Sequence, residues 1–544
     1  MTVKGHLLRS VSAIALVTFI SRICGYLRDQ RVALLLGTSP AADAFLLAFS
    51  LPSLVRRTVG EGALGASFIP VFAGYIRARS PEEGWEFARR VFWDLVIFLL
   101  VIATLGVAFS RQLIRALTLL AGMQGHWELA VYLNPIIFPA VFFFGLGALA
   151  AAILNSYYKF ALPASMPIFF NLVFIVFSLG VVYRPVMNLA PAEFQSPAVA
   201  LGVGVLLGSL AQFVLQIPAL LRQGMRFMFS VSVSDPGVRK VARLMGPAIL
   251  GVGVIQINFV VDRIFATASR MPAGSVTSLY FADRVMQLVL GVYAIAMSTA
   301  LLPTMSHLVA AGQIGKMKQT FGFSLRIVSF IAIPAAIGLI LLRQPIIQVL
   351  FQHGAFVAES TRLTGRALFY YSLGLPAFAA IRIITPMYYS TQDTQTPARI
   401  GFYSLILNIL LNSLFLVFLF RYLLNGSPAL ASSLAAYFNF FTLFLLFRRR
   451  YGSLGGRSLA AALSKMAICA GAMAAVCLAV LRFSNFPASP HLTYQAGWLC
   501  GIITVSVAIY LGAARVLRCE ELSELFRLFR RAEGGLAVQS GVQL

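Results

Sequence analysis

Residues 91–110 are Val-Phe-Trp-Asp-Leu-Val-Ile-Phe-Leu-Leu-Val-Ile-Ala-Thr-Leu-Gly-Val-Ala-Phe-Ser, an apolar run that contains a single charged residue, Asp94. A helix of ~20 such residues is long enough to cross the hydrocarbon core of a bilayer. Comparable runs recur along the whole chain. Open sheets cannot span lipid, and the runs are too long and continuous for barrel strands, so the pattern predicts an all-α polytopic membrane protein.

The overall composition agrees with lipid as the solvent for much of the surface. Of the 544 residues, 59% are apolar and 11% are charged, and the mean hydropathy is +0.85. A soluble domain carries about 25% charged residues. The net charge is +25, and many basic residues stand between apolar runs, which is typical of cytoplasmic loops that face anionic lipid. We therefore expect membrane lipids, and no nucleic acid, as partners of these basic residues.

Apolar segments predict about fourteen transmembrane helices. The segments lie near residues 10–36, 44–76, 91–110, 129–154, 161–183, 198–221, 243–268, 276–308, 320–342, 363–389, 397–420, 428–447, 459–481 and 495–514. Basic residues are concentrated at 77–90, 222–243 and 448–457, and again in the tail at 515–531. The positive-inside rule then places both termini in the cytoplasm, in agreement with an even number of spans.

Short matches indicate an internal repeat. Pro70 corresponds to Pro303, Arg111 to Arg343, and Pro163 to Pro397, at separations between 232 and 234 residues. We expect two six-helix lobes in a pseudo-twofold repeat, followed by two additional helices. The predicted boundaries are 1–225, 226–450 and 451–516, with a cytoplasmic amphipathic tail at 517–544. Two lobes that rock around a central site predict a transporter rather than an enzyme, and no GxxxxGK[ST] loop provides for ATP.

Ionisable residues inside the predicted spans mark the candidate site. A charge at the centre of a bilayer costs ~2.5–3.5 kcal/mol on insertion scales, so such residues are usually functional. They cluster in the first two spans of each lobe, as Arg22, Arg28, Asp29, Arg31, Asp43, Arg56, Arg57, Glu61, Asp262, Arg263, Asp283 and Arg284. Carboxylates are too few to neutralise every arginine, so a bound anion is the natural complement. Guanidinium groups bind phosphate oxygens in bidentate fashion, which favours a phosphate-rich ligand.

These arginines fall into two groups. We interpret four of them as ligand-binding: Arg22, Arg28, Arg56 and Arg284. The other three fit structural ion pairs, or side chains that extend to the lipid headgroups from helix ends: Arg31, Arg57 and Arg263.

Several uncharged or isolated residues have two or more interpretations. Gly25 either lets the first helix bend or allows close helix packing. Asn171 and Asn408 lie mid-span, where interhelical hydrogen bonds are the usual role. Asp262 fits an ion pair with an arginine of another helix, a proton site or a sodium site. Arg263 is adjacent in sequence and points about 100° away on a helix, so it is no automatic partner.

Several motifs resemble the bacterial MurJ (MviN) lipid II flippases of the MOP exporter superfamily. The matching segments are Ser21-Arg22-Ile23-Cys24-Gly25-Tyr26-Leu27-Arg28-Asp29, Ala42-Asp43-Ala44-Phe45, Gly246-Pro247-Ala248-Ile249-Leu250-Gly251, Tyr280-Phe281-Ala282-Asp283-Arg284, Phe351-Gln352-His353-Gly354 and Tyr389-Ser390-Thr391-Gln392-Asp393. The resemblance runs from about residue 7 to about residue 515. The opening motif and the Ala-Asp-Arg motif are specific to the family.

The resemblance implies a function and a set of site residues. It implies movement of lipid II from the cytoplasmic to the periplasmic leaflet of the bacterial inner membrane by alternating access, without a cofactor. The diphosphate and sugar head would enter a cationic cavity, and the last two helices would form a groove for the lipid tail. The substrate-binding residues would be Arg22, Arg28, Asp29, Arg56 and Arg284. The supporting residues would be Ser21, Gly25, Asp43, Glu61, Asn171 and Asp283.

The chain also departs from the family pattern. Some members carry lysine in place of Ser50 and glutamate in place of Gln287, so the roles of those two side chains do not carry over. Some members bind sodium in the C-terminal lobe. Asp262 and Asp393 match parts of that metal site, whereas its other ligands do not match. Coupling to Na⁺ or H⁺ is therefore an expectation that rests on these two residues.

Other functions fit the same architecture. One is a flippase for another undecaprenyl-linked oligosaccharide, and another is a MATE-like ion-coupled exporter. Drug exporters mostly carry cations, and a cavity lined by arginines argues against such substrates. A non-transporting scaffold would give buried arginines no role. The sequence does not define the oligomeric state, and a monomer is the simplest expectation.

Overall fold

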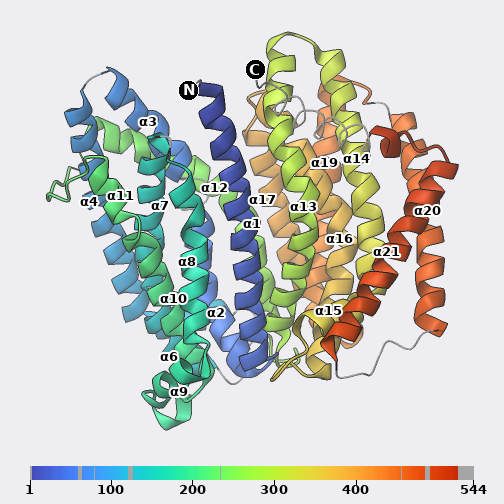
Figure 1. Cartoon of the computed structure of the whole chain (residues 1–544), viewed down its shortest axis with the longest axis horizontal. Helices are drawn as coiled ribbons and strands as arrows, with labels where there is room; N and C mark the ends of the chain where they lie inside the picture. Colours follow the sequence, from blue (N-terminus) through green and yellow to red (C-terminus); the bar gives the residue numbers. More distant parts are fainter. Residues whose placement is uncertain are drawn as a thin grey trace, which may run out of the picture. The chain divides into compact units, whose positions relative to one another are not determined.

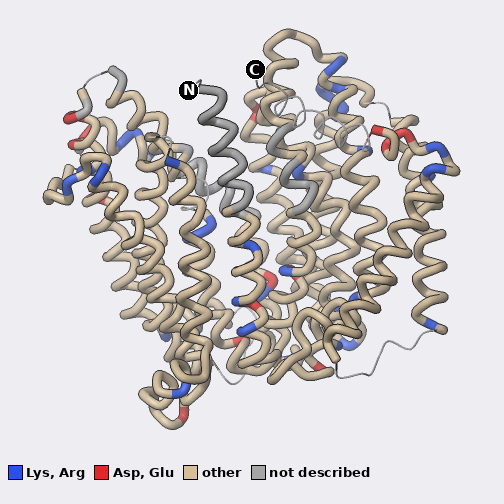
Figure 2. The backbone as a smooth tube through the Cα atoms, viewed as in Figure 1, with Lys and Arg blue, Asp and Glu red and all other residues tan. Residues whose placement is uncertain are grey.

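The fold is helical throughout the part of the chain that the structure describes. The computed structural model describes residues 3–58, 64–78, 80–119, 127–157, 159–232, 234–454, 456–483 and 491–524, and these contain helices and no strand. The predicted all-α class is confirmed. Figure 2 shows long stretches of uncharged helix, with charged residues concentrated toward helix ends.

Each of the fourteen predicted segments coincides with a helix or a pair of helices. Among the described residues, seven helical stretches are long and apolar enough to cross a membrane, or up to nine if each bent pair is one span. The bent pairs are Trp127–Ile137 with Ala140–Ser156, at 40°, and Ala161–Phe177 with Gly180–Asn188, at 69°. The number fourteen therefore stays a prediction, while the multi-span character is clear.

The chain divides into two compact units. The first contains Met1–Ser278 and Phe351–Ser360, and the second contains Leu279–Leu350 and Thr361–Leu544. The predicted boundaries at 225, 450 and 516 stay predictions. The first unit extends beyond residue 225 because the following helix packs on its earlier helices.

In its described residues the first unit contains helices α1 to α12, most of which are labelled in Figure 1. They are α1 (Val3–Leu36), α2 (Pro40–Val55), α3 (Leu64–Ala78), α4 (Pro81–Ala108), α5 (Ser110–Leu119), α6 (Trp127–Ile137), α7 (Ala140–Ser156), α8 (Ala161–Phe177), α9 (Gly180–Asn188), α10 (Pro197–Val214), α11 (Ile217–Arg222) and α12 (Pro236–Ala266). Ser39, Ser80 and Ser196 cap α2, α4 and α10, each followed by a proline that suits the first helical position. Helix α8 packs between α1 and α10, which brings polar residues of α1 and α8 together.

A strap that includes residues 227–232, 234 and 235 lies along α4 and leads into α12. Phe227 packs on Phe92, and Trp93 Nε1 donates a hydrogen bond to the carbonyl of Met228 at 2.8 Å. Asp235 ends the strap: it accepts from Arg90 Nη1 at 2.6 Å and from the backbone N–H groups of Gly237 and Val238. Burial raises the pKa of Asp235, but these hydrogen bonds and the Arg90 charge outweigh burial and lower the pKa overall. The first turn of α12 is thus fixed to α4.

A second junction forms where α1 ends. Gly37 and Gly274 both have positive φ, at 56° and 85°. A Cβ on Gly37 would lie 2.2 Å from the carbonyl oxygen of Ala355, and one on Gly274 would lie 2.0 Å from that of Thr38. Only glycine allows both the conformation and the approach. We call this contact of three segments the glycine junction.

The second unit contains the remaining helices. They are α13 (Ser275–Ala310), whose first residues belong to the first unit, α14 (Ile314–Leu341), α15 (Arg343–Phe351), α16 (Ala358–Ser390), α17 (Gln395–Leu414), a π turn at Phe415–Leu419, α18 (Phe420–Leu423), α19 (Ser427–Tyr451), α20 (Gly456–Phe483) and α21 (Leu492–Val516). Helices α20 and α21 pack on α14, where the Tyr510 hydroxyl donates to the carbonyl of Phe330 at 2.8 Å. A lipid-tail groove formed by these two helices stays a prediction.

Candidate functional site

Polar residues meet where α1 packs on α8. Arg28 donates from Nε and Nη2 to Asp29 Oδ1, at 3.0 and 2.7 Å, and from Nη1 to Asn171 Oδ1 at 3.1 Å. Its side chain is 12% exposed, so the ion pair is largely shielded from solvent. A Cβ on Gly25 would lie 3.7 Å from Asn171 Nδ2. The packing interpretation of Gly25 agrees with this contact, and α1 continues as helix through residue 25. The predicted interhelical role of Asn171 is confirmed.

Two aromatic rings that contact each other connect Arg56 to the same group. It follows the last residue of α2, and its guanidinium carbon lies 5.9 Å from the ring centroid of Phe144. The guanidinium carbon of Arg28 lies 6.0 Å from the ring centroid of Phe170. The two rings are themselves 5.6 Å apart. The structure therefore brings Arg28, Asp29, Arg56, Gly25 and Asn171 into one connected group in the first unit.

Two further predicted residues lie on α1, one turn or two before Arg28. Arg22 is exposed and Ser21 is half-buried. Within the described ranges, Arg22 makes no hydrogen bond or ion pair, so its charge is available to a ligand or to lipid headgroups. Glu61 lies outside the described residues.

Arg284 and Asp283 lie at the start of α13 in the second unit. The Arg284 guanidinium carbon lies 4.9 Å from the ring centroid of Tyr280, and Nη2 donates to the Tyr280 hydroxyl at 3.1 Å. Asp283 is buried and accepts from Gln287 Nε2 at 3.3 Å. Gln287 thus acts as a neutral donor to Asp283.

The three arginines that we expected to be structural each bind polar groups of another helix. Arg31 donates to Ser178 Oγ at 3.0 Å and to its carbonyl oxygen at 2.6 Å. Arg57 donates to Gln256 Oε1 at 3.0 Å, and Arg263 to Ser50 Oγ at 3.0 Å. The structural interpretation agrees with these bonds. A lysine in place of Ser50 would put a second positive charge beside Arg263.

Asp43 stabilises the glycine junction. The bonds described for its carboxylate go to Gly274 and Thr277, and none goes to an arginine. One carboxylate oxygen accepts from the Gly274 N–H at 2.8 Å, and the other accepts from the Thr277 N–H at 2.8 Å and its hydroxyl at 2.6 Å. These donors belong to the first turn of α13 and the residue before it. A carboxylate at a helix N-terminus is favoured by its unpaired N–H groups and its dipole.

The two residues predicted as sodium ligands lie in different surroundings. Asp262 is buried in α12, with 1% of its surface exposed. Asp393 accepts from Thr396 N–H and hydroxyl, at 3.0 and 2.8 Å, and from Arg450 at 3.1 Å. Burial raises the pKa of Asp393, but the Thr396 hydrogen bonds and the Arg450 charge outweigh it and lower the pKa. No group of three or more His, Cys, Asp or Glu that could hold a metal ion occurs among the described residues. A sodium site stays a prediction.

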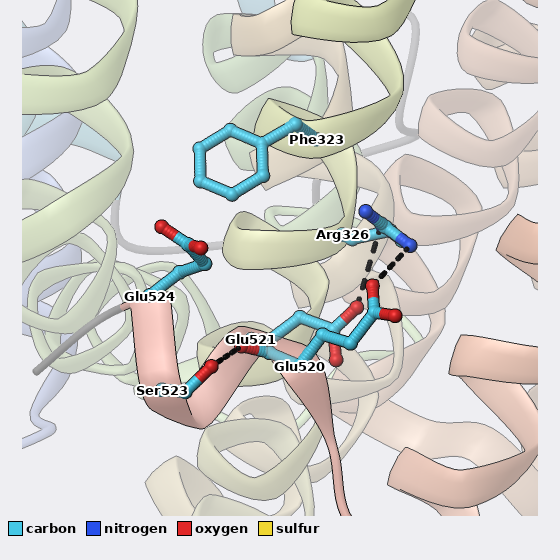
Figure 3. A pocket seen from close by; sticks show the side chains of 6 residues that line it. All are labelled: Phe323, Arg326, Glu520, Glu521, Ser523 and Glu524. Carbon is cyan, nitrogen blue, oxygen red and sulfur yellow. Dashed lines mark hydrogen bonds and ion pairs between the residues drawn. The ribbon is translucent and has the colours of Figure 1, made fainter. Parts of the chain in front are cut away.

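A surface pocket lies elsewhere, where α14 meets the residues that follow α21. Figure 3 shows Arg326 facing both Glu520 and Glu521. The two ion pairs are 3.4 Å long each. Phe323, Ser523 and Glu524 complete the lining. Three carboxylates around one guanidinium leave this pocket acidic, so it is unsuited to an anionic headgroup. The two ion pairs instead hold the start of the predicted tail against α14. Residues 525–544 lie outside the described residues.

The sequence did not reveal Phe144 and Phe170. Aromatic residues in apolar spans usually face lipid or other helices, and their sequence pattern does not separate those roles from contact with a cation. The contact between Tyr280 and Arg284 was easier to predict, because Tyr280 precedes Arg284 by four residues and so lies on the same face of the helix.

Comparison with known families decides between the transporter types. The family model described as "Lipid II flippase MurJ" matches residues 32–494. The chain belongs to the MurJ lipid II flippase family. A protein of Vibrio cholerae named "Probable lipid II flippase MurJ" is 34% identical, over 81% of this chain and 82% of its own length. One of Rhizobium meliloti with the same name is 32% identical over 98% of each chain.

Solved structures agree with MurJ membership. A "Lipid II flippase MurJ, inward closed conformation" has a TM-score of 0.76 and 26% identity, and covers 93% of this chain and 98% of its own. A "multidrug resistance MATE family transporter" in an inward-facing conformation has a TM-score of 0.64 at 16% identity, over 79% of this chain and 94% of its own, which shows a shared fold alone. The MATE-like exporter function is therefore not favoured. Family membership and the apolar helices identify a protein of the bacterial inner membrane.

Proposed function

We propose that this chain translocates lipid II from the cytoplasmic to the periplasmic leaflet by alternating access. MurJ membership over most of the chain is the observation that carries the proposal. As a transporter it would move its substrate across the membrane without making or breaking a covalent bond. We expect it to act without an enzymatic step, and as a monomer.

The arginines of α1 and of the turn after α2 would bind the diphosphate. In the first unit, Arg28 and Arg56 belong to the connected group, and Arg22 lies about two turns before Arg28 on α1. Arg284, in the second unit, is a further residue that we expect to bind phosphate. A bound diphosphate would offer these guanidinium groups phosphate oxygens, which a guanidinium binds in bidentate fashion.

The test is depletion of the protein in its host, followed by identification of the lipid-linked precursor that accumulates on the cytoplasmic leaflet. Lipid II is the expected precursor. Accumulation of another undecaprenyl-linked oligosaccharide, with normal lipid II turnover, would assign the chain to that substrate instead. Re-expression of the wild-type chain should reverse the accumulation and serves as the control.

We also propose that both termini are cytoplasmic, because the basic loops and tail favour that side. A Gly535→Cys variant should react with a membrane-impermeant thiol reagent only after the membrane is opened. The native cysteines are the background, so the variant is compared with wild type. Labelling of position 535 in intact cells would contradict the topology.

Ion coupling through Asp262 is a further part of the proposal. A buried aspartate in an apolar helix is costly unless it is neutralised, and neutralisation by Na⁺ or H⁺ would bias one conformation over another. The test is flipping by Asp262→Asn in vesicles with a sodium or proton gradient imposed and removed. If the variant flips as fast as wild type and responds identically to each gradient, Asp262 has no coupling role.

A further inference from the structure

Two buried phenylalanine rings connect the candidate arginines of the first unit. The Phe170 ring on α8 lies by the Arg28 guanidinium, the Phe144 ring on α7 lies by that of Arg56, and the rings contact each other with an interplanar angle of 53°. Phe144 is 2% exposed and Phe170 is 5% exposed. We call Phe144 and Phe170 the aromatic bridge.

Helix α10 fixes the position of the bridge. A Cβ on Gly208 would lie 2.9 Å from Phe170 Cδ2 and 3.0 Å from the Phe170 carbonyl oxygen. The Phe170 ring therefore rests against bare backbone and has no room to move toward α10. Asn171, the next residue of α8, accepts the hydrogen bond from Arg28 Nη1. Two consecutive residues of α8 thus contact the Arg28 guanidinium, which Asp29 holds from α1.

An aromatic ring holds a guanidinium differently from a carboxylate. The negative face of the ring attracts the cation, but the ring carries no net charge and so does not itself neutralise the guanidinium. A cation that is already positioned also loses less side-chain freedom when an anion binds. Rings beside arginines are therefore suited to a site where guanidinium groups must be held in place before phosphate binds.

We infer that the aromatic bridge positions Arg28 and Arg56 as a pair, and that the pair makes the site prefer a diphosphate lipid over a monophosphate lipid. This inference rests on the proposed function and specifies its headgroup chemistry. A diphosphate offers a phosphoryl group to each arginine, whereas a monophosphate offers one group to both. Phe144 and Phe170 act through the arginines and are positioning residues.

The test measures binding of undecaprenyl diphosphate and undecaprenyl monophosphate to the purified full-length chain, since the shared tail contributes equally to both. Phe170→Leu and Phe144→Leu remove a ring and keep an apolar side chain. Each should weaken diphosphate binding by roughly 3- to 30-fold and monophosphate binding by less. The matched control is Phe174→Leu, one turn along α8. Phe174 is buried and contacts Phe170, and no arginine of the described ranges lies over it.

A double-mutant cycle separates positioning from packing. In the Arg28→Ala background, Phe170→Leu should have little further effect on diphosphate binding, because the guanidinium that Phe170 positions is absent. Equal weakening by Phe170→Leu and Phe174→Leu, or full additivity in the cycle, would overturn the inference. If Phe170→Leu does not fold, Phe170→Met takes its place, and thermal unfolding of every variant is measured alongside.

The outcomes also distinguish this inference from the proposed function. If Arg28→Ala itself leaves diphosphate binding unchanged, the proposed binding site is wrong. If Arg28→Ala weakens binding and neither bridge variant does, the site stands and the aromatic bridge has no role in it.

Discussion

The middle of α1 and its C-terminal end make contacts of opposite kinds. In the middle, Arg28 and Asp29 meet Asn171 and Phe170 through side chains. At the end, the glycine junction places backbone against backbone, where the Ala355 N–H donates to the Leu34 carbonyl at 2.9 Å. Side-chain contacts can be altered without moving the helix, whereas backbone contacts cannot. We therefore expect substitutions in the middle to change transport and those at the end to change stability.

The largest effect is expected for the arginines themselves. Arg28→Ala and Arg284→Ala should each abolish complementation of a flippase-depleted cell, while the protein still inserts into the membrane. Arg28→Lys should rescue poorly, because an ammonium group lacks the bidentate fork. Growth and membrane abundance are measured together. Normal growth with both alanine variants would show that the middle of α1 does not carry the binding chemistry.

Gly274→Ala tests the other side of the comparison. The new Cβ would meet the Thr38 carbonyl oxygen, so the backbone must shift, at a cost of about 1–3 kcal/mol beyond the strain of positive φ. The matched control is Gly312→Ala, where φ is 66° but no atom lies within 4 Å. We expect a lower thermal unfolding temperature in detergent for Gly274→Ala than for Gly312→Ala. Equal temperatures would mean that the junction contributes only its backbone conformation.

The sequence predicted the side-chain region better than the backbone region. Charge in an apolar span identified Arg28, and the mid-span position of Asn171 predicted its interhelical bond, because both signals are carried by residue type. The glycine junction unites segments near residues 37, 274 and 355, and nothing local in the sequence indicates which segments meet. The same holds for the strap on α4 and for the aromatic bridge, since ring contacts depend on packing between helices that are distant in the chain.

Asn171→Ala should have an intermediate effect. It removes one acceptor of Arg28 and leaves the ion pair with Asp29. The loss of one hydrogen bond costs ~1 kcal/mol, so the flipping rate should fall severalfold. Asn408→Ala is the control, because Asn408 is also a buried mid-helix residue and donates to Ser432 at 2.9 Å. We expect the control to lose stability and keep its flipping rate. Equal flipping rates in the two variants would assign Asn171 a purely structural role.

The smallest effect is expected for Arg31, which lies between the two regions of α1. Its guanidinium binds the hydroxyl and carbonyl oxygens of Ser178, the C-cap residue of α8. A cation at a helix C-terminus contributes about 0.3–1 kcal/mol. Arg31→Gln should therefore lower the unfolding temperature slightly and leave the flipping rate in vesicles unchanged. Arg31→Lys should fall between Arg31→Gln and wild type, because it keeps the charge but loses the paired donors. If Arg31→Gln instead abolishes flipping with the fold intact, the binding region extends along α1 toward the glycine junction, and the division between a functional middle and a structural end must move past residue 31.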